Sequence, residues 1–514
     1  MSRTKSSLLN FTCAMIGQIL GLIVSFIARI FFIKILGSEY LGLNGLFTNI
    51  LSVLSLAELG VGSAITYSLY KPLAENDTNK CKMLMDLYQK IYITIGIIIL
   101  ILGILIIPFL PLFIKDIPNI DNINLIYILF VINTAISYFY SYKRNLIIAD
   151  QNRYIATIYR YGFYIILNIA QIIYLILAKN YIGYLILQII STLLENILVS
   201  IKANKMYPYL KDKNKVPIDT TTKNEIIKNT KAMMMHKVGG VIVNSTDNII
   251  LSKYVGLFYV GLYSNYSLII TALNTILGQI YNSVTASVGN LVASTNKDKQ
   301  YEIYKNINFL TFWVHCFSSI CLLILFNPFI EIWLGKEQLF SMDITLILVI
   351  NFYITGMRKS NLTFREASGL FEKDKYKALF EALINIVASI ALAIKFGTFG
   401  VFLGTFISSI ATSVWVEPFI LYKYEFNKKF SIYIKHYIKE LIILISIAIP
   451  LYFICNIINF NIYLTFIVKC LICLIVPNLV LYFIYKESDE FKYFYNKILI
   501  NIINILKRRL KYEK

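Results

Sequence analysis

Long apolar segments recur along the whole chain of 514 residues, and only 15% of the residues are charged. A helix needs about 20 apolar residues to cross the hydrocarbon core of a bilayer. We identify fourteen such segments, centred near residues 20, 55, 102, 132, 167, 191, 242, 275, 317, 350, 386, 410, 447 and 473. Backbone groups inside a bilayer must be hydrogen-bonded within the segment, so this pattern predicts an all-α polytopic membrane protein with about fourteen transmembrane helices.

The positions of the 49 Lys and Arg residues test this count. With the N-terminus placed inside, the outside loops hold only Lys34, Lys115, Lys179, Lys253, Lys336 and Lys395, and the spans hold Arg29, Lys237 and Lys469. This alternation predicts a multi-pass protein of the cytoplasmic membrane with both termini in the cytoplasm. The same bias, with attraction to anionic membrane lipids, accounts for the net charge of +20, so no nucleic-acid partner is expected.

The chain also contains an internal repeat. Residues 15–43 match residues 234–262 at an offset of 219, with ten identities among the 29 pairs, including Gly42 with Gly261. Further along, Asn168 matches Asn385 and Gly183 matches Gly400 at an offset of 217. Each copy would hold six spans, so we predict a parallel repeat with its axis along the membrane normal.

The repeat and the loop composition predict the domain organisation. We expect an N-terminal six-helix half (1–202), a basic cytoplasmic linker (203–230), a C-terminal six-helix half (231–422), two additional transmembrane helices (423–486) and a basic amphipathic cytoplasmic tail (487–514). The two additional helices have no counterpart in the duplication.

Polar residues at helical spacing mark one face of the first segment in each half. In half one this stripe contains Gln18, Ser25 and Arg29, and in half two it contains Lys237, Asn244, Asp247 and Asn248. Polar groups in a span are costly and normally face the protein interior, so we expect the stripe to line a cavity. Arg29 and Lys237 would attract a phosphate group there. Two alternatives remain: Arg29 pairs with Asp247 and only joins the halves, and Lys237 merely flanks its span.

Glu58 lies near the middle of the second segment, where a charge costs roughly 2.5–3.5 kcal/mol. It could bind a coupling ion, either a proton or sodium. It could equally make a structural hydrogen bond to a neighbouring helix. We find no P-loop pattern and no histidine pair at zinc spacing, so we expect no catalytic residue, no bound metal and no cofactor besides a coupling ion.

Two stretches carry a family resemblance. Residues 37–77 read GSEYLGLNGLFTNILSVLSLAELGVGSAITYSLYKPLAEND, and residues 246–269 read TDNIILSKYVGLFYVGLYSNYSLI. The chain resembles the Wzx-type oligosaccharide flippases, which belong to a superfamily with toxin-extrusion multidrug exporters and lipid II flippases. The resemblance implies alternating access between two six-helix halves. It also implies transfer of undecaprenyl-diphosphate-linked oligosaccharide repeat units to the outer leaflet of the bacterial cytoplasmic membrane, for O-antigen or capsule synthesis.

The same resemblance implies a lipid-linked oligosaccharide as the substrate, with a polysaccharide polymerase and other export proteins as further partners. Two other functions stay open at this point. An ion-coupled multidrug exporter would have the same fold, although a cationic stripe would bind cationic drugs poorly. A membrane glycan polymerase or ligase is disfavoured, because the outside loops are too short to house a catalytic site.

Overall fold

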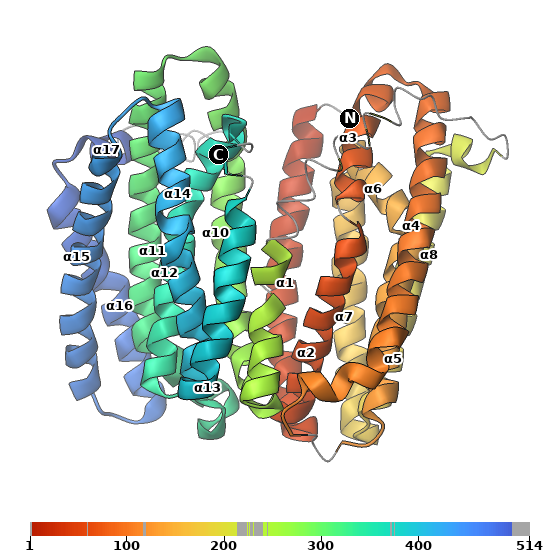
Figure 1. Cartoon of the computed structure of the whole chain (residues 1–514), viewed down its shortest axis with the longest axis horizontal. Coiled ribbons are helices and arrows are strands. Elements are labelled where there is room, and N and C mark those ends of the chain that lie inside the picture. The colour runs from red at the N-terminus through yellow and green to blue at the C-terminus, as the bar shows by residue number, and fades with distance from the viewer. Residues whose placement is uncertain are drawn as a thin grey trace, which may run out of the picture. The chain divides into compact units, whose positions relative to one another are not determined.

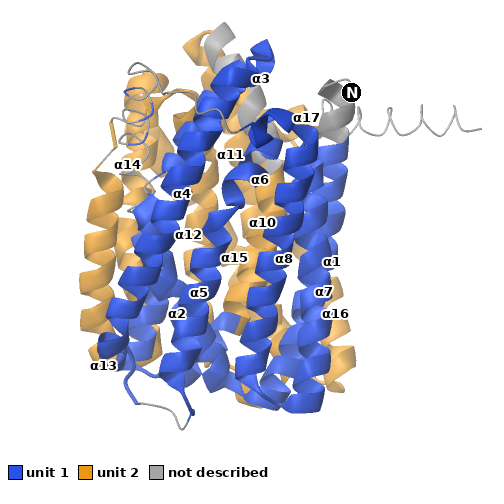
Figure 2. Cartoon of the chain, turned by 90° about the vertical axis from the view of Figure 1, so that its right-hand side faces the viewer, with its two compact units in different colours: residues 1–264 blue, residues 265–514 orange. Residues whose placement is uncertain are grey.

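The computed structural model of the chain describes residues 3–58, 60–116, 120–212, 224, 226, 230, 240–243, 245–370, 373–374 and 376–495. Every element assigned within these ranges is helical (Figure 1). The chain divides into two compact units, residues 1–264 and residues 265–514 (Figure 2), and each is described by itself. Most of the predicted linker after Asp212 and the tail after Tyr495 lie outside the described residues.

Unit 1 contains α1 (Arg3–Leu36), α2 (Ser38–Leu54), η1 (Ser55–Glu58), α3 (Val61–Glu75), α4 (Thr78–Ile106), η2 (Ile107–Phe113), α5 (Ile123–Phe139), α6 (Ser141–Ala149), α7 (Arg153–Ala178), α8 (Tyr181–Met206) and η3 (Pro208–Lys211). Helix α10 (Leu257–Ser294) begins in unit 1 and continues into unit 2. Unit 2 further contains α11 (Lys297–Leu334), η4 (Lys336–Gln338), α12 (Met342–Ala367), α13 (Lys377–Ala411), α14 (Ser413–Ile420), η6 (Leu421–Glu425), α15 (Phe430–Ile457), α16 (Ile462–Tyr485) and α17 (Asp489–Tyr493).

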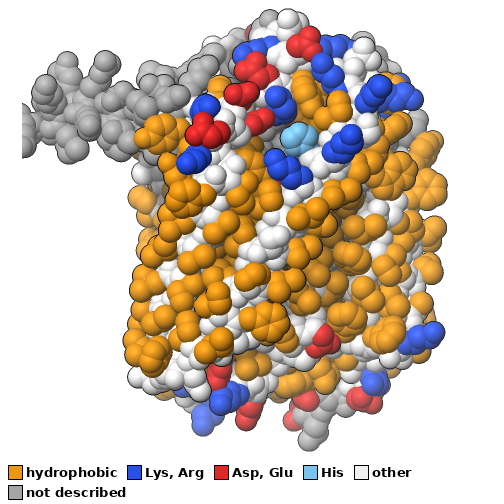
Figure 3. Space-filling model, turned by 90° about the vertical axis from the view of Figure 1, so that its left-hand side faces the viewer, with side chains coloured by type: hydrophobic (Ala, Val, Ile, Leu, Met, Phe, Trp, Pro, Cys, Tyr) orange, Lys and Arg blue, Asp and Glu red, His pale blue; other side chains and the backbone are white. Residues whose placement is uncertain are grey.

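The described residues include ten helices that are long and apolar enough to cross a membrane, or eleven if the bent pair α5 and α6 forms one span. The face drawn in Figure 3 carries a broad apolar surface, with charged side chains gathered at its two ends. Exposed apolar residues on α15 and α16, such as Phe453, Ile457 and Phe483, are suited to contact with lipid tails. The chain is therefore a multi-pass membrane protein.

The expected count of fourteen spans stays a prediction. The segment centred near residue 242 lies only partly within the described residues. The segment near 350 corresponds to α12, which is absent from the ten apolar helices because Arg358, Lys359 and Arg365 lie along it. Most of α12 is buried within unit 2, so its side chains meet other helices instead of lipid.

Helix α13 consists of two arms that fold back on each other at Gly397. The backbone there has φ 56° and ψ −132°, a conformation that favours glycine. A Cβ atom at Gly400 would come within 2.1 Å of the Leu392 carbonyl oxygen, so the arms touch backbone to backbone. The Ser389 hydroxyl donates to the Val401 carbonyl oxygen at 3.0 Å. The sequence segments near 386 and 410 are thus separate helical arms.

Within unit 1, the two copies of the repeat meet through glycines. A Cβ atom at Gly42 would lie 2.0 Å from the Leu257 carbonyl oxygen, and one at Gly261 would lie 2.1 Å from the Ser38 carbonyl oxygen. Gly42 and Gly261 are repeat partners at the offset of 219, and so are Ser38 and Leu257. Reciprocal contacts of this kind are what a two-fold relation between the copies produces. Small residues allow the helices this close approach.

We expect Gly42→Val and Gly261→Val each to lower the free energy of unfolding, by about 1–3 kcal/mol, because the new side chain overlaps a backbone oxygen. Thermal unfolding of the purified protein in detergent measures the effect. Gly278→Val is the matched control, since a Cβ atom at Gly278 meets nothing within 4 Å. Equal midpoints for all three variants would contradict the close approach.

Candidate functional site

The predicted stripe on α1 packs against α7. Ser25 Oγ donates to the Gly21 carbonyl oxygen at 2.8 Å and lies 2.6 Å from the Tyr164 hydroxyl. A Cβ atom at Gly21 would lie 3.0 Å from the Tyr161 ring. Gln18 on the same face is buried. The structure therefore brings Gln18 and Ser25 together on one helix interface inside unit 1, and their role in lining a cavity stays a prediction.

Arg29 extends this interface by one helical turn. Its side chain is half-buried, and Tyr164 and Tyr184 are its electrostatic neighbours. Tyr164 belongs to α7 and Tyr184 to α8, so the Arg29 side chain lies near both helices.

The half-two part of the stripe is described only in part. Lys237 and Asn244 lie outside the described residues. Asp247 is buried, and Asn248 Nδ2 lies 3.9 Å from the position a Cβ atom would take at Gly45 on α2. Asn248 is therefore placed beside the first half's second segment. The alternative ion pair between Arg29 and Asp247 stays a prediction.

Glu58 ends η1, where the second apolar segment breaks before α3. The Tyr92 hydroxyl on α4 donates to Glu58 Oε1 at 2.8 Å. The break lies at Gly60, where the backbone φ is 81°, a value that glycine adopts without strain. The hydroxyl of Tyr88 donates to the Gly62 carbonyl oxygen at 2.8 Å. Glu58 thus accepts a hydrogen bond from a neighbouring helix, and both interpretations of Glu58, ion coupling and a structural role, stay predictions.

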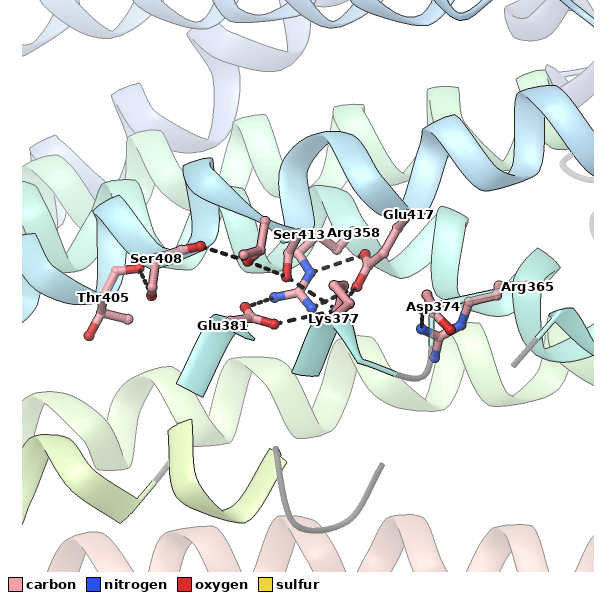
Figure 4. Close-up of polar contacts among 10 residues, drawn as sticks. Arg358, Arg365, Asp374, Lys377, Glu381, Thr405, Ser408, Ser413 and Glu417 are labelled. Atoms are coloured by element: carbon pink, nitrogen blue, oxygen red, sulfur yellow. Dashed lines mark hydrogen bonds and ion pairs between the residues drawn. The ribbon is translucent and has the colours of Figure 1, made fainter. Parts of the chain in front are cut away.

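A buried ion-pair network in unit 2 was not predicted from the sequence. Arg358 on α12 donates two hydrogen bonds to Glu417 on α14, Nη2 to Oε1 at 2.8 Å and Nε to Oε2 at 3.1 Å (Figure 4). Its Nη1 also donates to Glu381 Oε1 on α13 at 3.1 Å. Lys377 pairs with Glu417 and, at 3.4 Å, with Glu381. Two cations and two carboxylates cancel, which is the condition for burying them in an apolar interior.

Unit 1 also contains a partly buried ion pair between two helices. Arg144 on α6 pairs with Glu195 on α8 at 2.6 Å and donates to Asn196 Oδ1 at 3.2 Å. Arg160 on α7 acts electrostatically on Arg144, and it precedes Lys377 by the repeat offset of 217. At the same offset, Glu381 corresponds to Tyr164.

The two networks differ in charge. The unit 1 group consists of Arg144, Glu195 and Asn196, and the position that matches Glu381 at the offset of 217 is occupied by Tyr164. Arg160 is exposed, and the structure gives it no ion pair among the residues it describes. Arg160 and Tyr164 are one helical turn apart, and Tyr164 bonds Ser25 next to Arg29. Arg160 and Arg29 thus lie on two helices, α7 and α1, that are joined by the contact between Tyr164 and Ser25.

Sequence reasoning missed both networks because their members are far apart along the chain. A partial signal was available, because the sixth segment of each half carries a glutamate, Glu195 in half one and Glu417 in half two. Among the described residues, no group of three His, Cys, Asp or Glu side chains is placed to hold a metal ion.

No family model and no curated protein matches the chain. Among solved structures, its fold is similar to that of the lipid II flippase MurJ in an inward closed conformation. The TM-score is 0.65 at 19% identity, over 93% of this chain and 99% of that one. It is also similar to an inward-facing multidrug resistance MATE family transporter of the MOP superfamily, with TM-score 0.64 and 14% identity over 80% and 97% of the two chains.

A MOP superfamily transporter from Pyrococcus furiosus is similar as well, with TM-score 0.54 and 13% identity over 82% of this chain and 97% of that one. At such identities the likeness shows the fold. The class follows from it: this is a multi-pass membrane protein with the fold that MurJ shares with MATE transporters. The proteins whose fold it shares are transporters and a flippase.

We expect Glu417→Gln to lower the free energy of unfolding by about 3–5 kcal/mol, because it leaves Arg358 and Lys377 buried with one carboxylate. Adding Lys377→Met should recover part of the loss, since the remaining Arg358 and Glu381 are neutral together. Thermal unfolding in detergent measures both variants.

The matched control is Glu302→Gln, which removes an exposed ion pair with Lys299 and should have little effect. If Glu417→Gln behaved like this control, or if the second substitution added to the loss, the network would not be the stabilising unit described here.

Proposed function

We propose that this protein is a flippase that moves undecaprenyl-diphosphate-linked oligosaccharide repeat units from the inner to the outer leaflet of the bacterial cytoplasmic membrane. Transport would proceed by alternating access and serve synthesis of a surface polysaccharide such as O-antigen or capsule. The observation that supports the proposal is coverage. The likeness to a lipid II flippase extends over 93% of this chain, whereas the likeness to the MATE family transporter and to the Pyrococcus furiosus transporter extends over 80% and 82%.

The charge pattern of unit 1 supports an anionic substrate. Arg29 lies on α1, and Arg160 is exposed on α7 without an ion pair among the described residues. A guanidinium can donate two parallel hydrogen bonds to a phosphate group. In our proposal these arginines attract the diphosphate, while Lys237, Asn244 and Asn248 would contribute from the second copy. Polar neutral groups such as Gln18 and Ser25 would accompany the sugars.

The driving force belongs to the same proposal. Glu58 and Asp247 are candidates for binding a coupling proton or sodium ion. The polysaccharide polymerase would receive the translocated substrate on the outer leaflet, with both termini of this chain in the cytoplasm. Multidrug export on the same fold is the competing function, supported by the nearly equal TM-score of 0.64.

We expect Arg29→Ala to reduce export of surface polysaccharide on the order of ten- to hundredfold, the equivalent of a lost charge-assisted hydrogen bond of about 1.5–3 kcal/mol. Arg29→Lys should retain part of the activity, because it keeps the charge and loses the planar fork. The measurement is the amount of surface polysaccharide in cells expressing each variant at equal membrane levels.

Lys34→Ala is the control on the same helix, because Lys34 is exposed in the last turn of α1. Normal export by a well-inserted Arg29→Ala variant would contradict the role of Arg29 in reading the diphosphate.

A further inference from the structure

A cavity of about 130 Å³ lies in unit 2 between α11, α15, α16 and α17. It belongs to the appended helices α15 and α16, and none of the four residues of the ion-pair network lines it. Tyr433 of its wall lies within electrostatic reach of Glu417. Its charged and titratable rim consists of Lys305, His436, Lys439 and Glu490. The end of unit 2 that bears α17 gathers acidic, basic and histidine side chains on the face drawn in Figure 3. The cavity therefore opens toward a polar end of the unit.

Tyrosines form most of the inner wall. Tyr304, Tyr422, Tyr433, Tyr437 and Tyr485 line the cavity, and Tyr353 on α12 and Cys316 on α11 lie within electrostatic reach of its inner end. The cavity ends at Glu440, which is only 6% exposed. A carboxyl group thus lies at the bottom of an aromatic cavity with a charged mouth.

Glu440 has no cation paired with it among the described residues. Its Oε1 accepts one hydrogen bond from Asn308 Nδ2 at 3.2 Å. The adjacent Lys439 places its ammonium group 5.5 Å above the Tyr485 ring, and Lys305 pairs with Glu490 at 3.8 Å. Lys439 also acts electrostatically on Glu440, but neither cation forms an ion pair with it among the described residues.

This arrangement contrasts with the other buried acids of unit 2. Glu381 and Glu417 are equally buried, and each contacts both Arg358 and Lys377. An ionised carboxylate without such compensation is costly in an apolar interior, and the usual response is to take up a proton. The cavity supplies a path for that proton between Glu440 and the polar end of the unit.

A hydrogen-bond chain connects Glu440 to α12. Asn308 Oδ1 accepts from Ser360 Oγ at 2.9 Å, and Ser360 lies two residues after Arg358. Ionised Glu440 can only accept from Asn308, whereas a protonated carboxyl group also donates. A change in protonation therefore alters hydrogen bonding that reaches the helix carrying the ion-pair network.

We propose that Glu440 is a proton-binding site, filled through this cavity, whose occupancy is sensed by α12 through Asn308 and Ser360. The step moves one proton from water at the cavity mouth to a carboxylate oxygen of Glu440. The proposed binding of a proton at Glu440 does not depend on which substrate the protein transports. Its coupling to transport rests on the proposed flippase function.

Infrared difference spectroscopy of the full-length protein in lipid nanodiscs, titrated with acid, tests the binding step. We expect the carbonyl stretch of a protonated carboxylic acid to appear in the wild type and to be lost in Glu440→Gln. Glu302→Gln is the control, because it removes an exposed acid of α11 that does not line this cavity, and it should keep the band. A band of equal size in wild type and Glu440→Gln overturns the assignment. A band that sodium removes at constant pH and ionic strength indicates cation binding and also overturns it.

A second measurement needs no substitution. A hydrophobic carbodiimide reacts with protonated carboxyl groups in apolar surroundings, and mass spectrometry locates the modified peptide. We expect modification at Glu440 in the wild type to rise as the pH falls. An unmodified Glu440 over the whole pH range contradicts the proposal, whether or not Glu440→Gln folds.

Transport measurements then distinguish proton binding at Glu440 from the coupling of that binding to transport. We expect glycolipid transport by Glu440→Gln to lose its dependence on pH while the wild type retains it. An unchanged pH dependence overturns the coupling step alone. A wild-type protein that shows the infrared band but no glycolipid transport overturns the proposed function and leaves the proton site standing.

Discussion

An ion inside an apolar protein interior must be compensated, and this constraint shapes unit 2. Arg358 and Lys377 are held by Glu381 and Glu417, so that α12, α13 and α14 are joined by charges that sum to zero. The desolvation of each ion costs several kcal/mol, which makes the group sensitive to loss of any one member. Because α12 carries Arg358 and is mostly buried, it can be polar without being exposed to lipid. Where compensation is missing, as at Glu440, a proton is the simplest partner.

The internal repeat bears on the same requirement that buried charges be compensated. Gly42 and Gly261 touch each other's segments through equivalent carbonyl groups, so the copies approach closely at matched positions. Away from this contact the copies diverge. Tyr164 stands where the other copy has Glu381, and Arg144 of unit 1 pairs with one carboxylate, Glu195. Matched positions such as Gly42 and Gly261 thus serve packing. Where the two copies differ, the local charge differs, and this difference is the basis for proposing an anionic substrate.

Much of the fold was predictable from the sequence, because apolar length and helical polar spacing are local properties. The helical class, the membrane setting, the separate arms near residues 386 and 410, and the shared face of Gln18 and Ser25 follow from such patterns. The partners of Arg358 were not predictable, since Glu417 lies 59 positions away and one sequence contains no record of contacts. Nor could the spacing show that Tyr92 on another helix would donate to Glu58. The roles of Lys237 and Asn244 stay predictions.

The central claim is that the chain moves a lipid-linked oligosaccharide between leaflets. The most direct measurement is a leaflet-accessibility assay in vesicles containing the purified protein and an undecaprenyl-diphosphate-linked oligosaccharide, read with a sugar-specific probe that cannot cross the membrane. The account predicts that the accessible fraction changes with time while the glycan length stays constant, and that cationic drugs are not transported. A lengthened glycan, or drug transport with no change in glycolipid accessibility, would contradict it.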